Sequence, residues 1–240
     1  MRGDMKLEHL SLGQDTIRDL PDETVHIWKV ELDESAAQLA ELKQSLSPEE
    51  CARAERFHFG GDHNRFIAAR GSLRVVLGGY LNLPPRQVQI SYTPDKKPVL
   101  TSNSYGALQF NVTHSDALAL IAVTRAREIG IDIECLRTDF DADALAKRFF
   151  APTEYAAIDQ TPPDERHATF LHYWTCKEAY LKALGTGLRV SLRDFTVALD
   201  NASVTLTGPK GNGTDIAPYR LYLLNPSPEY VAAIAIAQPG

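Results

Sequence analysis

The chain is 240 residues long, and 44% of its residues are hydrophobic and 23% charged. These values are ordinary for globular proteins and exclude a disordered, collagen-like or coiled-coil chain. The formal net charge of −6 argues against nucleic acid or an anionic membrane surface as the main partner, so any anionic ligand needs a local basic cluster. The longest apolar runs, 117–123 and 230–237, are far shorter than the roughly 20 residues that span a bilayer. Because polar sequence follows Met1, we expect a cytoplasmic protein.

The first half of the chain has the pattern of a strand followed by two helices. Residues Val25–Leu32 alternate well enough to predict a strand. The segment Ser47-Pro48-Glu49-Glu50 is typical of a helix start, because a hydroxyl caps the helix, proline fits its first turn and carboxylates favour its positive end. A second helical pattern follows over residues 65–78, and Leu83-Pro84-Pro85 closes it.

The second half contains more strand candidates. Leu118–Val123 and Ile129–Ile133 are apolar, β-branched runs separated by polar residues, and they predict a β-hairpin. Further strand candidates lie between Gly, Pro and Asn turns at residues 203–207, 220–224 and 230–237. The sequence therefore predicts an α+β fold, with mixed or antiparallel sheets and helices packed on one face of each.

The two halves of the chain resemble each other weakly. Aligning Gly78 with Gly185, each after a helical pattern, also aligns Arg70 with Lys177. This alignment indicates a duplicated unit of about a hundred residues. Two unrelated helices that each end at a glycine C-cap would give the same pattern. We expect two lobes, residues 1–109 and residues 110–240, with the acidic residues described next in the second.

Two carboxylates lie in the strand pattern Gly130-Ile131-Asp132-Ile133-Glu134. The period of two residues places Asp132 and Glu134 on one face of the strand. A wet acidic edge strand would have the same sequence. If the pair is partly buried, two carboxylates about 5 Å apart repel by roughly 3 kcal/mol at an effective dielectric constant of 20. A divalent cation would relieve this repulsion, and oxygen ligands suit Mg²⁺.

A second polar pair lies in the helical segment 174–182. Glu178 and Lys182 are four residues apart and share one helix face, and Trp174 lies on the same side. A surface ion pair, which stabilises a helix by about 0.3 to 0.5 kcal/mol, is the simplest interpretation. The tryptophan indicates that this face is not simply solvated, which favours a functional site.

The third polar segment, Phe110–Asp116, precedes the apolar run at Leu118, and we expect it to form a turn. Thr113 has a hydroxyl that can donate to an oxyanion. His114 can donate to a phosphate oxygen or titrate near neutral pH. A single histidine in a turn is more often structural, so this segment alone does not indicate a function.

Taken in order along the chain, these segments resemble the motifs of the 4'-phosphopantetheinyl transferases, of the large two-lobed type that activates peptide and polyketide synthases. The resemblance extends from about Ser47 to Phe195. Its matching blocks are 110–115 (Phe-Asn-Val-Thr-His-Ser), 130–134 (Gly-Ile-Asp-Ile-Glu), 174–188 (from Trp-Thr-Cys-Lys-Glu to Gly-Thr-Gly-Leu), 65–70 and the pair Lys97-Pro98.

The resemblance implies transfer of 4'-phosphopantetheine from coenzyme A to a serine of an acyl or peptidyl carrier protein, with release of adenosine 3',5'-bisphosphate. It also implies two similar lobes that form a pseudo-dimer with coenzyme A in the cleft between them. Asp132, Glu134 and Glu178 would hold Mg²⁺ against the diphosphate, and Mn²⁺ would suit the same oxygen ligands. Glu178 would take the serine proton, and Lys182 would stabilise or protonate the leaving phosphate.

The resemblance also implies residues that contact coenzyme A. His114, which we also count as catalytic, and Thr113 would lie at the diphosphate. Basic residues would bind the other phosphates, because guanidinium groups match phosphate geometry. The complete set expected at coenzyme A is Arg53, Arg65, Arg70, Lys96, Lys97, Pro98, Thr113, His114 and Lys182.

Two residues depart from the pattern that the resemblance implies. Lys96 stands where a glycine usually precedes the Lys-Pro pair, so we expect the loop to lack a backbone conformation that glycine permits. Glu50 stands where some relatives carry a basic residue. Both affect the contacts with the nucleotide phosphates and leave the acidic residues unaffected.

Other functions remain open at this point. A coenzyme A diphosphate hydrolase would use similar chemistry, and Arg127-Glu128-Ile129-Gly130 matches a fragment of the Nudix signature. A non-catalytic module that binds coenzyme A or a carrier protein would not need the acidic residues, and a plain structural protein would scatter them. The resemblance implies an acidic helical carrier protein that relatives meet in the region 139–163, so we expect a monomer with a locally basic or apolar docking surface. In that region we expect Phe149, Phe150 or both to lie in the core.

Overall fold

The computed structural model describes residues 6–17, 19–101, 107–186, 189–200, 203–208 and 219–238. The chain forms two compact units. The first contains residues 1–92 and 98–126, and the second contains residues 93–97 and 127–240. The sequence analysis predicted a boundary between two lobes at residues 109 and 110. In the structure, the two strands within residues 108–125 lie in the first unit, because they pair with its sheet.

The first unit is built on a four-stranded sheet with the order β1-β2-β6-β5. Its strands are β1 (Lys6–Ser11), β2 (Thr24–Glu31), β5 (Leu108–Ser115) and β6 (Leu118–Arg125). β1 and β2 are parallel, and the other neighbouring strands are antiparallel. A separate antiparallel pair consists of β3 (Ile90–Tyr92) and β4 (Pro98–Leu100). The strand predicted at 25–32 is confirmed as β2.

The predicted hairpin between residues 118–123 and 129–133 is wrong. β6 pairs with β2 and β5, and its residues Leu118–Thr124 are buried, as expected of a central strand covered on both faces. The strand at 129–135, β7 (Ile129–Cys135), pairs with a strand near the C-terminus in the second unit. The expected turn at 110–116 is also wrong for residues 110–115, which belong to β5. Asp116, with a φ of 47°, lies in the tight turn between β5 and β6.

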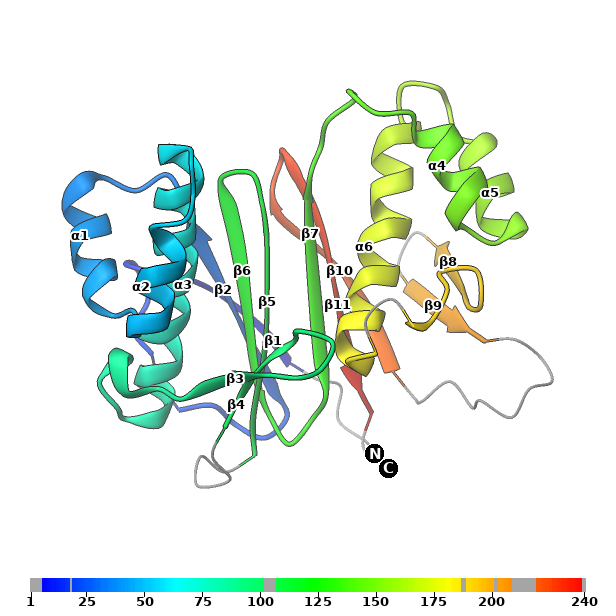
Figure 1. The fold of residues 1–240 in the computed structure, drawn as a ribbon. Coiled ribbons are helices and arrows are strands. Elements are labelled where there is room, and N and C mark those ends of the chain that lie inside the picture. The colour runs from blue at the N-terminus through cyan, green and yellow to red at the C-terminus, as the bar shows by residue number, and fades with distance from the viewer. Residues whose placement is uncertain are drawn as a thin grey trace. The chain divides into compact units, whose positions relative to one another are not determined.

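Helices cover the sheet of the first unit (Figure 1). They are α1 (Ala36–Gln44), α2 (Pro48–Ala54), α3 (Gly60–Leu81) and the 3₁₀ turn η1 (Pro85–Gln87). Ser47 caps α2 as predicted, since its hydroxyl accepts from the Glu50 N–H and the Glu50 carboxylate accepts from the Ser47 N–H. α3 ends at Asn82, which has a left-handed backbone conformation. Gly78 is therefore not the cap; it lies inside α3, where a Cβ would approach the Leu83 carbonyl within 3.0 Å.

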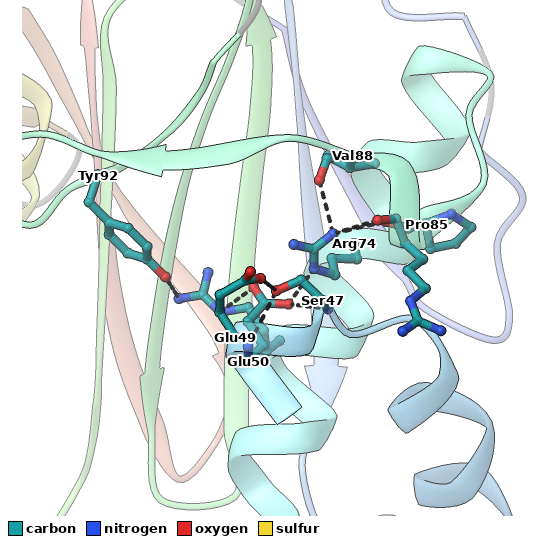
Figure 2. Close-up of polar contacts among 9 residues, drawn as sticks. Ser47, Glu49, Glu50, Arg74, Pro85, Val88 and Tyr92 are labelled. Carbon is teal, nitrogen blue, oxygen red and sulfur yellow. Dashed lines mark hydrogen bonds and ion pairs between the residues drawn. The ribbon is translucent and has the colours of Figure 1, made fainter. Parts of the chain in front are cut away.

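A buried ion pair connects α2 to α3 in the first unit. Arg74 of α3 is 4% exposed, and its guanidinium binds the Glu50 carboxylate (Figure 2). Arg74 Nη1 also donates to the carbonyls of Pro85 at 3.1 Å and Val88 at 2.9 Å. Glu50, which departs from the pattern that the resemblance implies, therefore caps α2 and neutralises a buried cation in the same unit.

The second unit has a five-stranded antiparallel sheet with the order β7-β11-β10-β9-β8. Besides β7, its strands are β8 (Thr196–Asp200), β9 (Ser203–Thr207), β10 (Tyr219–Ser227) and β11 (Tyr230–Ala237). Its helices are α4 (Ala142–Phe149), α5 (Pro152–Asp159) and α6 (Arg166–Leu184), and Figure 1 shows α6 lying along the sheet. The three strands predicted in this region are confirmed. Each unit thus combines a sheet with packed helices, which confirms the α+β class.

An aromatic cluster forms part of the core of the second unit. Phe150 is 2% exposed and stacks on Phe170 with ring centroids 5.1 Å apart. Phe149 is partly buried and meets Trp174 edge to face. The expectation that at least one of the neighbouring phenylalanines lies in the core is confirmed.

No helix in the described parts of the chain is long and apolar enough to cross a bilayer.

Candidate active site

A close contact between a strand and a helix brings the acidic residues of the second unit together. α6 lies directly on β7 at Gly130, where a Cβ would come within 3.0 Å of backbone atoms of Ala179, Lys182 and Ala183. Only glycine permits this approach. Because side chains alternate along β7, Asp132 and Glu134 share the face of Gly130 and thus lie toward α6, which carries Glu178.

Asp132, Glu134 and Glu178 form what we call the acidic group, and Asp132 is its buried member. It is 5% exposed, and its Oδ1 accepts a hydrogen bond from Lys182 Nζ at 2.6 Å. Lys182 Nζ also donates to the Ile131 carbonyl at 3.2 Å. Burial, with a smaller contribution from the charges of Glu134 and Glu178, raises the pKa of Asp132 to about 6, although Lys182 opposes this shift.

The three carboxylates influence one another electrostatically. Burial raises the pKa of Glu178, Lys182 lowers it, and Glu134 raises it again. Asp132 responds to both glutamates. Within the described ranges, however, no three His, Cys, Asp or Glu side chains are gathered closely enough to hold a metal ion. The structure therefore gives a mutually repelling acidic group balanced by Lys182, and not an assembled metal cage.

Lys97 also belongs to the second unit, and its side chain is part-buried. Its ammonium donates to the carbonyls of Lys182 at 2.6 Å, Ala183 at 3.3 Å and Ile129 at 3.3 Å. Desolvation lowers the pKa of Lys97, and the charge of Glu128 opposes this shift. The Lys97 side chain thus contacts the C-terminal end of α6 and the first residue of β7.

Lys96 and Pro98 flank Lys97. Lys96 has a φ of 64°, the left-handed conformation that glycine favours, so the expectation that the loop lacks this conformation is wrong. A lysine adopts it at a steric cost of roughly 1 to 2 kcal/mol. The turn is closed by the Lys96 N–H, which donates to the Thr93 carbonyl at 2.8 Å. Pro98 then begins β4 in the first unit.

The other expected ligands of coenzyme A lie in the first unit. Thr113 and His114 are neighbours in β5, so their side chains point to opposite faces, and Thr113 is buried while His114 is exposed. Arg65 binds Asp33 through Nε at 2.8 Å and Asp116 through Nη1 at 2.7 Å. These hydrogen bonds raise the pKa of Arg65.

Arg70 and Arg53 also have internal contacts. Arg70 lies 3.5 Å from the Glu50 carboxylate and donates to the Tyr92 hydroxyl at 2.6 Å. The Arg53 guanidinium lies 5.2 Å from the centre of the Phe66 ring. The structure therefore places the expected basic residues on the protein's own carboxylates, hydroxyl and aromatic groups.

Sequence reasoning missed Lys177, which adjoins Glu178. Its side chain is fully buried, with Nζ 2.8 Å from Glu154 Oε1. The sequence contains a signal for this pair, because Pro-x-Glu opens the helices at both Glu50 and Glu154, and a cation follows each glutamate within a long helix. The alignment of Gly78 with Gly185 obscured this signal by placing Arg70, and not Arg74, against Lys177.

Comparisons with known proteins assign the whole chain to one family. A model described as the 4'-phosphopantetheinyl transferase superfamily matches residues 128–235, and one described as 4'-phosphopantetheinyl transferase, N-terminal, matches residues 31–126. The chain is 41% identical over 236 residues to the 4'-phosphopantetheinyl transferase HetI of Nostoc sp. strain PCC 7120, covering 98% of this chain and 96% of that protein. It is 29% identical to the 4'-phosphopantetheinyl transferase Sfp of Bacillus subtilis strain 168, covering 81% and 83% of the two chains.

Among solved structures, a holo-(acyl-carrier-protein) synthase from Bacillus anthracis in complex with CoA (3',5'-ADP) is 25% identical, with a TM-score of 0.40. The match covers 47% of this chain and 96% of that one. The family assignment depends on the sequence matches, which extend over nearly the full length. The chain belongs to the 4'-phosphopantetheinyl transferase superfamily and is of its Sfp-like type.

Proposed function

We propose that this enzyme transfers 4'-phosphopantetheine from coenzyme A to a serine hydroxyl of an acyl or peptidyl carrier protein and releases adenosine 3',5'-bisphosphate. The observation that carries the proposal is the acidic group on β7 and α6, balanced by Lys182, in a chain related to HetI over nearly its full length. Phosphoryl-type transfer requires such a site, because positioning and charge stabilisation supply most of its catalysis.

The reaction forms one bond and breaks one. The serine oxygen of the carrier protein attacks the phosphorus that bears the pantetheine group, and the bond from that phosphorus to the oxygen bridging the diphosphate breaks. The serine proton passes to Glu178, directly or through water. Because burial raises the pKa of Glu178, this carboxylate is a stronger base than an exposed glutamate. Lys182 stabilises or protonates the phosphate that leaves with the nucleotide.

The donor set suits a hard divalent cation. Asp132, Glu134 and Glu178 supply only carboxylate oxygens, and their mutual repulsion would fall if a cation bound between them. We propose that these three residues hold Mg²⁺ when the substrate is bound, and Mn²⁺ fits the same ligands. When bound, the ion would neutralise negative charge on the diphosphate oxygens. Before it binds, Lys182 keeps the Asp132 charge compensated.

The first unit supplies further proposed contacts with coenzyme A. His114 is exposed on β5 and can donate to a diphosphate oxygen. For the remaining phosphates we propose Arg53, Arg65 and Arg70 of the first unit and Lys96 of the second unit. Each of the three arginines must share or exchange its internal contact when it binds a phosphate. The monomeric state, the cytoplasmic location and a carrier-docking surface in residues 139–163 stay predictions.

The test is incubation of the protein with coenzyme A, MgCl₂ and an unmodified carrier protein, followed by intact-mass measurement of the carrier. A carrier that gains the mass of one phosphopantetheine group supports the proposal. Phosphopantetheine released into solution would identify a coenzyme A diphosphate hydrolase instead. Binding of coenzyme A without either product would identify a non-catalytic binding module. A carrier whose serine is replaced by alanine is the matched control and gains no mass.

A further inference from the structure

The five residues between β3 and β4 form a closed turn that belongs to the second unit, although both strands belong to the first. The Thr93 N–H donates to the Lys97 carbonyl at 2.9 Å, and the Lys97 N–H donates to the Thr93 hydroxyl at 3.2 Å. The left-handed conformation of Lys96 closes the turn. These contacts hold the Lys97 backbone in place independently of the contacts that the Lys97 side chain makes.

The Lys97 side chain reaches the C-terminal end of α6. A helix C-terminus exposes carbonyl oxygens that lack partners within the helix and carry partial negative charge. The Lys97 ammonium donates to two of them, on Lys182 and Ala183, at 2.6 and 3.3 Å. The Lys97 Cδ would lie 3.7 Å from a Cβ added at Gly185, so the aliphatic part of the side chain covers the glycine that ends α6.

The third contact of the ammonium is on the neighbouring strand. Lys97 Nζ donates to the carbonyl of Ile129, the first residue of β7, at 3.3 Å. One ammonium thus joins the end of α6 that carries Lys182 to the end of β7 that leads to Asp132. The Lys182 and Asp132 side chains form the 2.6 Å ion pair of the acidic group.

These contacts use the full donor capacity of the lysine. An ammonium has three N–H donors, and three carbonyl oxygens lie within hydrogen-bond distance of Lys97 Nζ. A phosphate of coenzyme A would have to displace one of these contacts from a part-buried cation. The geometry therefore favours an internal role over the phosphate contact that the family resemblance implied for this side chain.

We propose that Lys97 is a positioning residue, which caps α6 and joins it to β7 so that Glu178 and Lys182 face Asp132 in the geometry that the reaction needs. This inference rests on the proposed transfer reaction. It predicts that the Lys97 side chain affects the turnover rate more than the affinity for coenzyme A.

The experiment compares the wild type with Lys97→Met, which keeps the aliphatic stem and removes the donors, and with Lys97→Arg, which keeps the charge. Initial rates of carrier modification give kcat and the KM for coenzyme A. Hydrogen–deuterium exchange reports the protection of amides in α6 and β7. Lys43→Met is the matched control, because Lys43 is a lysine in the last turn of α1 whose ammonium binds the surface residue Glu55.

We expect Lys97→Met to lower kcat about tenfold or more, since small misplacements of reacting groups can cost about 100-fold. We expect the KM for coenzyme A to change less than about threefold, exchange to rise at residues 180–184 and 129–132, and Lys97→Arg to recover part of kcat. A raised KM with unchanged kcat and exchange would overturn the proposal in favour of a phosphate contact. A lowered Tm with unchanged kcat would overturn it in favour of a purely structural role.

The outcomes separate this inference from the proposed function. If the wild type modifies no carrier protein, the transfer reaction fails, while exchange in Lys97→Met still tests the contact between α6 and β7. If Lys97→Met does not fold, Lys97→Arg carries the test, because a guanidinium cannot reproduce all three ammonium contacts. Wild-type kcat and wild-type exchange in Lys97→Arg would then overturn the need for the observed geometry.

Discussion

Glu154 and Lys177 form an ion pair that is sealed inside the second unit, with side chains 1% and 0% exposed. The Lys177 ammonium lies 2.8 Å from Glu154 Oε1 and donates to the carbonyls of Leu192 at 2.6 Å and Phe195 at 2.7 Å. Glu154 also accepts from the Val197 N–H at 2.7 Å, at the start of β8. The pair therefore connects α5, α6 and the segment that leads into β8.

The first unit contains the same arrangement of a buried glutamate and a buried cation. Glu50 is the third residue of α2, as Glu154 is of α5, and each binds a cation in the long helix that follows. Arg74 and Lys177 both also donate to carbonyls of the segment after that helix. Aligning the left-handed caps, Asn82 and Gly185, superimposes the two cations in sequence, which the alignment of Gly78 with Gly185 does not. The repeated arrangement supports the predicted duplication with this corrected alignment.

The buried pair predicts a large loss of stability on single substitution. Lys177→Met leaves the Glu154 charge uncompensated and should lower the free energy of unfolding by about 3 to 5 kcal/mol. The double variant Lys177→Met, Glu154→Gln should recover part of this loss, because neither side chain of the pair is then charged. Chemical denaturation measures both. The exposed pair of Lys43 with Glu55 is the control, and Lys43→Met should cost less than about 1 kcal/mol. A double variant less stable than the single one would contradict the charge argument.

The contact of α6 with Gly130 predicts a second loss. Gly130→Ala places a Cβ against backbone atoms of α6, which cannot move aside as a flexible side chain would. The free energy of unfolding should fall by roughly 2 kcal/mol or more, and carrier modification should fall with it as α6 is pushed from β7. Urea denaturation and initial rates measure the two effects. Gly61→Ala is the control, because nothing lies within 4 Å of a Cβ at Gly61, and it should be neutral or stabilising.

The raised pKa of Asp132 predicts a pH-dependent stability without added divalent cation. The pKa is about 6 in the folded protein and 3.8 ordinarily, so the folded state favours the protonated form. Protonation of Asp132 therefore contributes to the free energy of unfolding. This contribution is fully present below pH 4 and is lost as the pH rises through 6. Over that window the wild type should lose on the order of 3 kcal/mol relative to Asp132→Asn. Urea titrations of both proteins at several pH values measure the difference. A difference that stays constant from pH 4 to pH 7 would contradict the pKa.

Local patterns in the sequence predicted local structure well. The helix start at Ser47 and the shared face of Asp132 and Glu134 follow from neighbouring residues, and both are confirmed. Strand partners could not be predicted in the same way. Runs at 118–123 and 129–133 are adjacent in sequence, yet β6 pairs with β2, and β7 pairs with β11, because burial of a whole sheet decides the pairing. Polar residues of β5 such as Asn111 and Thr113 resembled a turn, although the sheet buries them.

The contacts of the site cations also lay beyond the sequence. Lys97 was placed near the reaction by resemblance alone, and Lys182 by resemblance together with its helical spacing from Glu178. That Lys97 binds the backbone at the end of α6 depends on a turn inserted between two strands of the other unit. No spacing in the sequence encodes that contact. Lys177 was missed for the same reason, since its partner Glu154 lies in a different helix.

Glu178 as the proposed base predicts a selective loss of activity. Glu178→Gln keeps the size of the side chain and removes its basicity, so the turnover rate should fall by about 100-fold to 10,000-fold. The affinity for coenzyme A should change less than the turnover rate, because two of the three proposed Mg²⁺ ligands, Asp132 and Glu134, remain. Intact-mass kinetics and calorimetric titration with coenzyme A measure the two quantities. A variant that modifies the carrier at the wild-type rate would exclude Glu178 as the base.

Lys96 predicts a gain of stability. Its φ of 64° costs a residue with a Cβ roughly 1 to 2 kcal/mol, and glycine does not bear that cost. Glycine also increases the entropy of the unfolded chain, which lowers the free energy of unfolding by about 0.4 to 1 kcal/mol and offsets part of this gain. Lys96→Gly should therefore raise the free energy of unfolding by roughly 0.5 to 1 kcal/mol. Lys96→Ala is the control: it removes the same charge, keeps a Cβ in the left-handed conformation and should give no gain. An equal rise in the free energy of unfolding in both variants would mean that the lysine charge destabilises the folded state. The left-handed backbone conformation of Lys96 would then not be the cause.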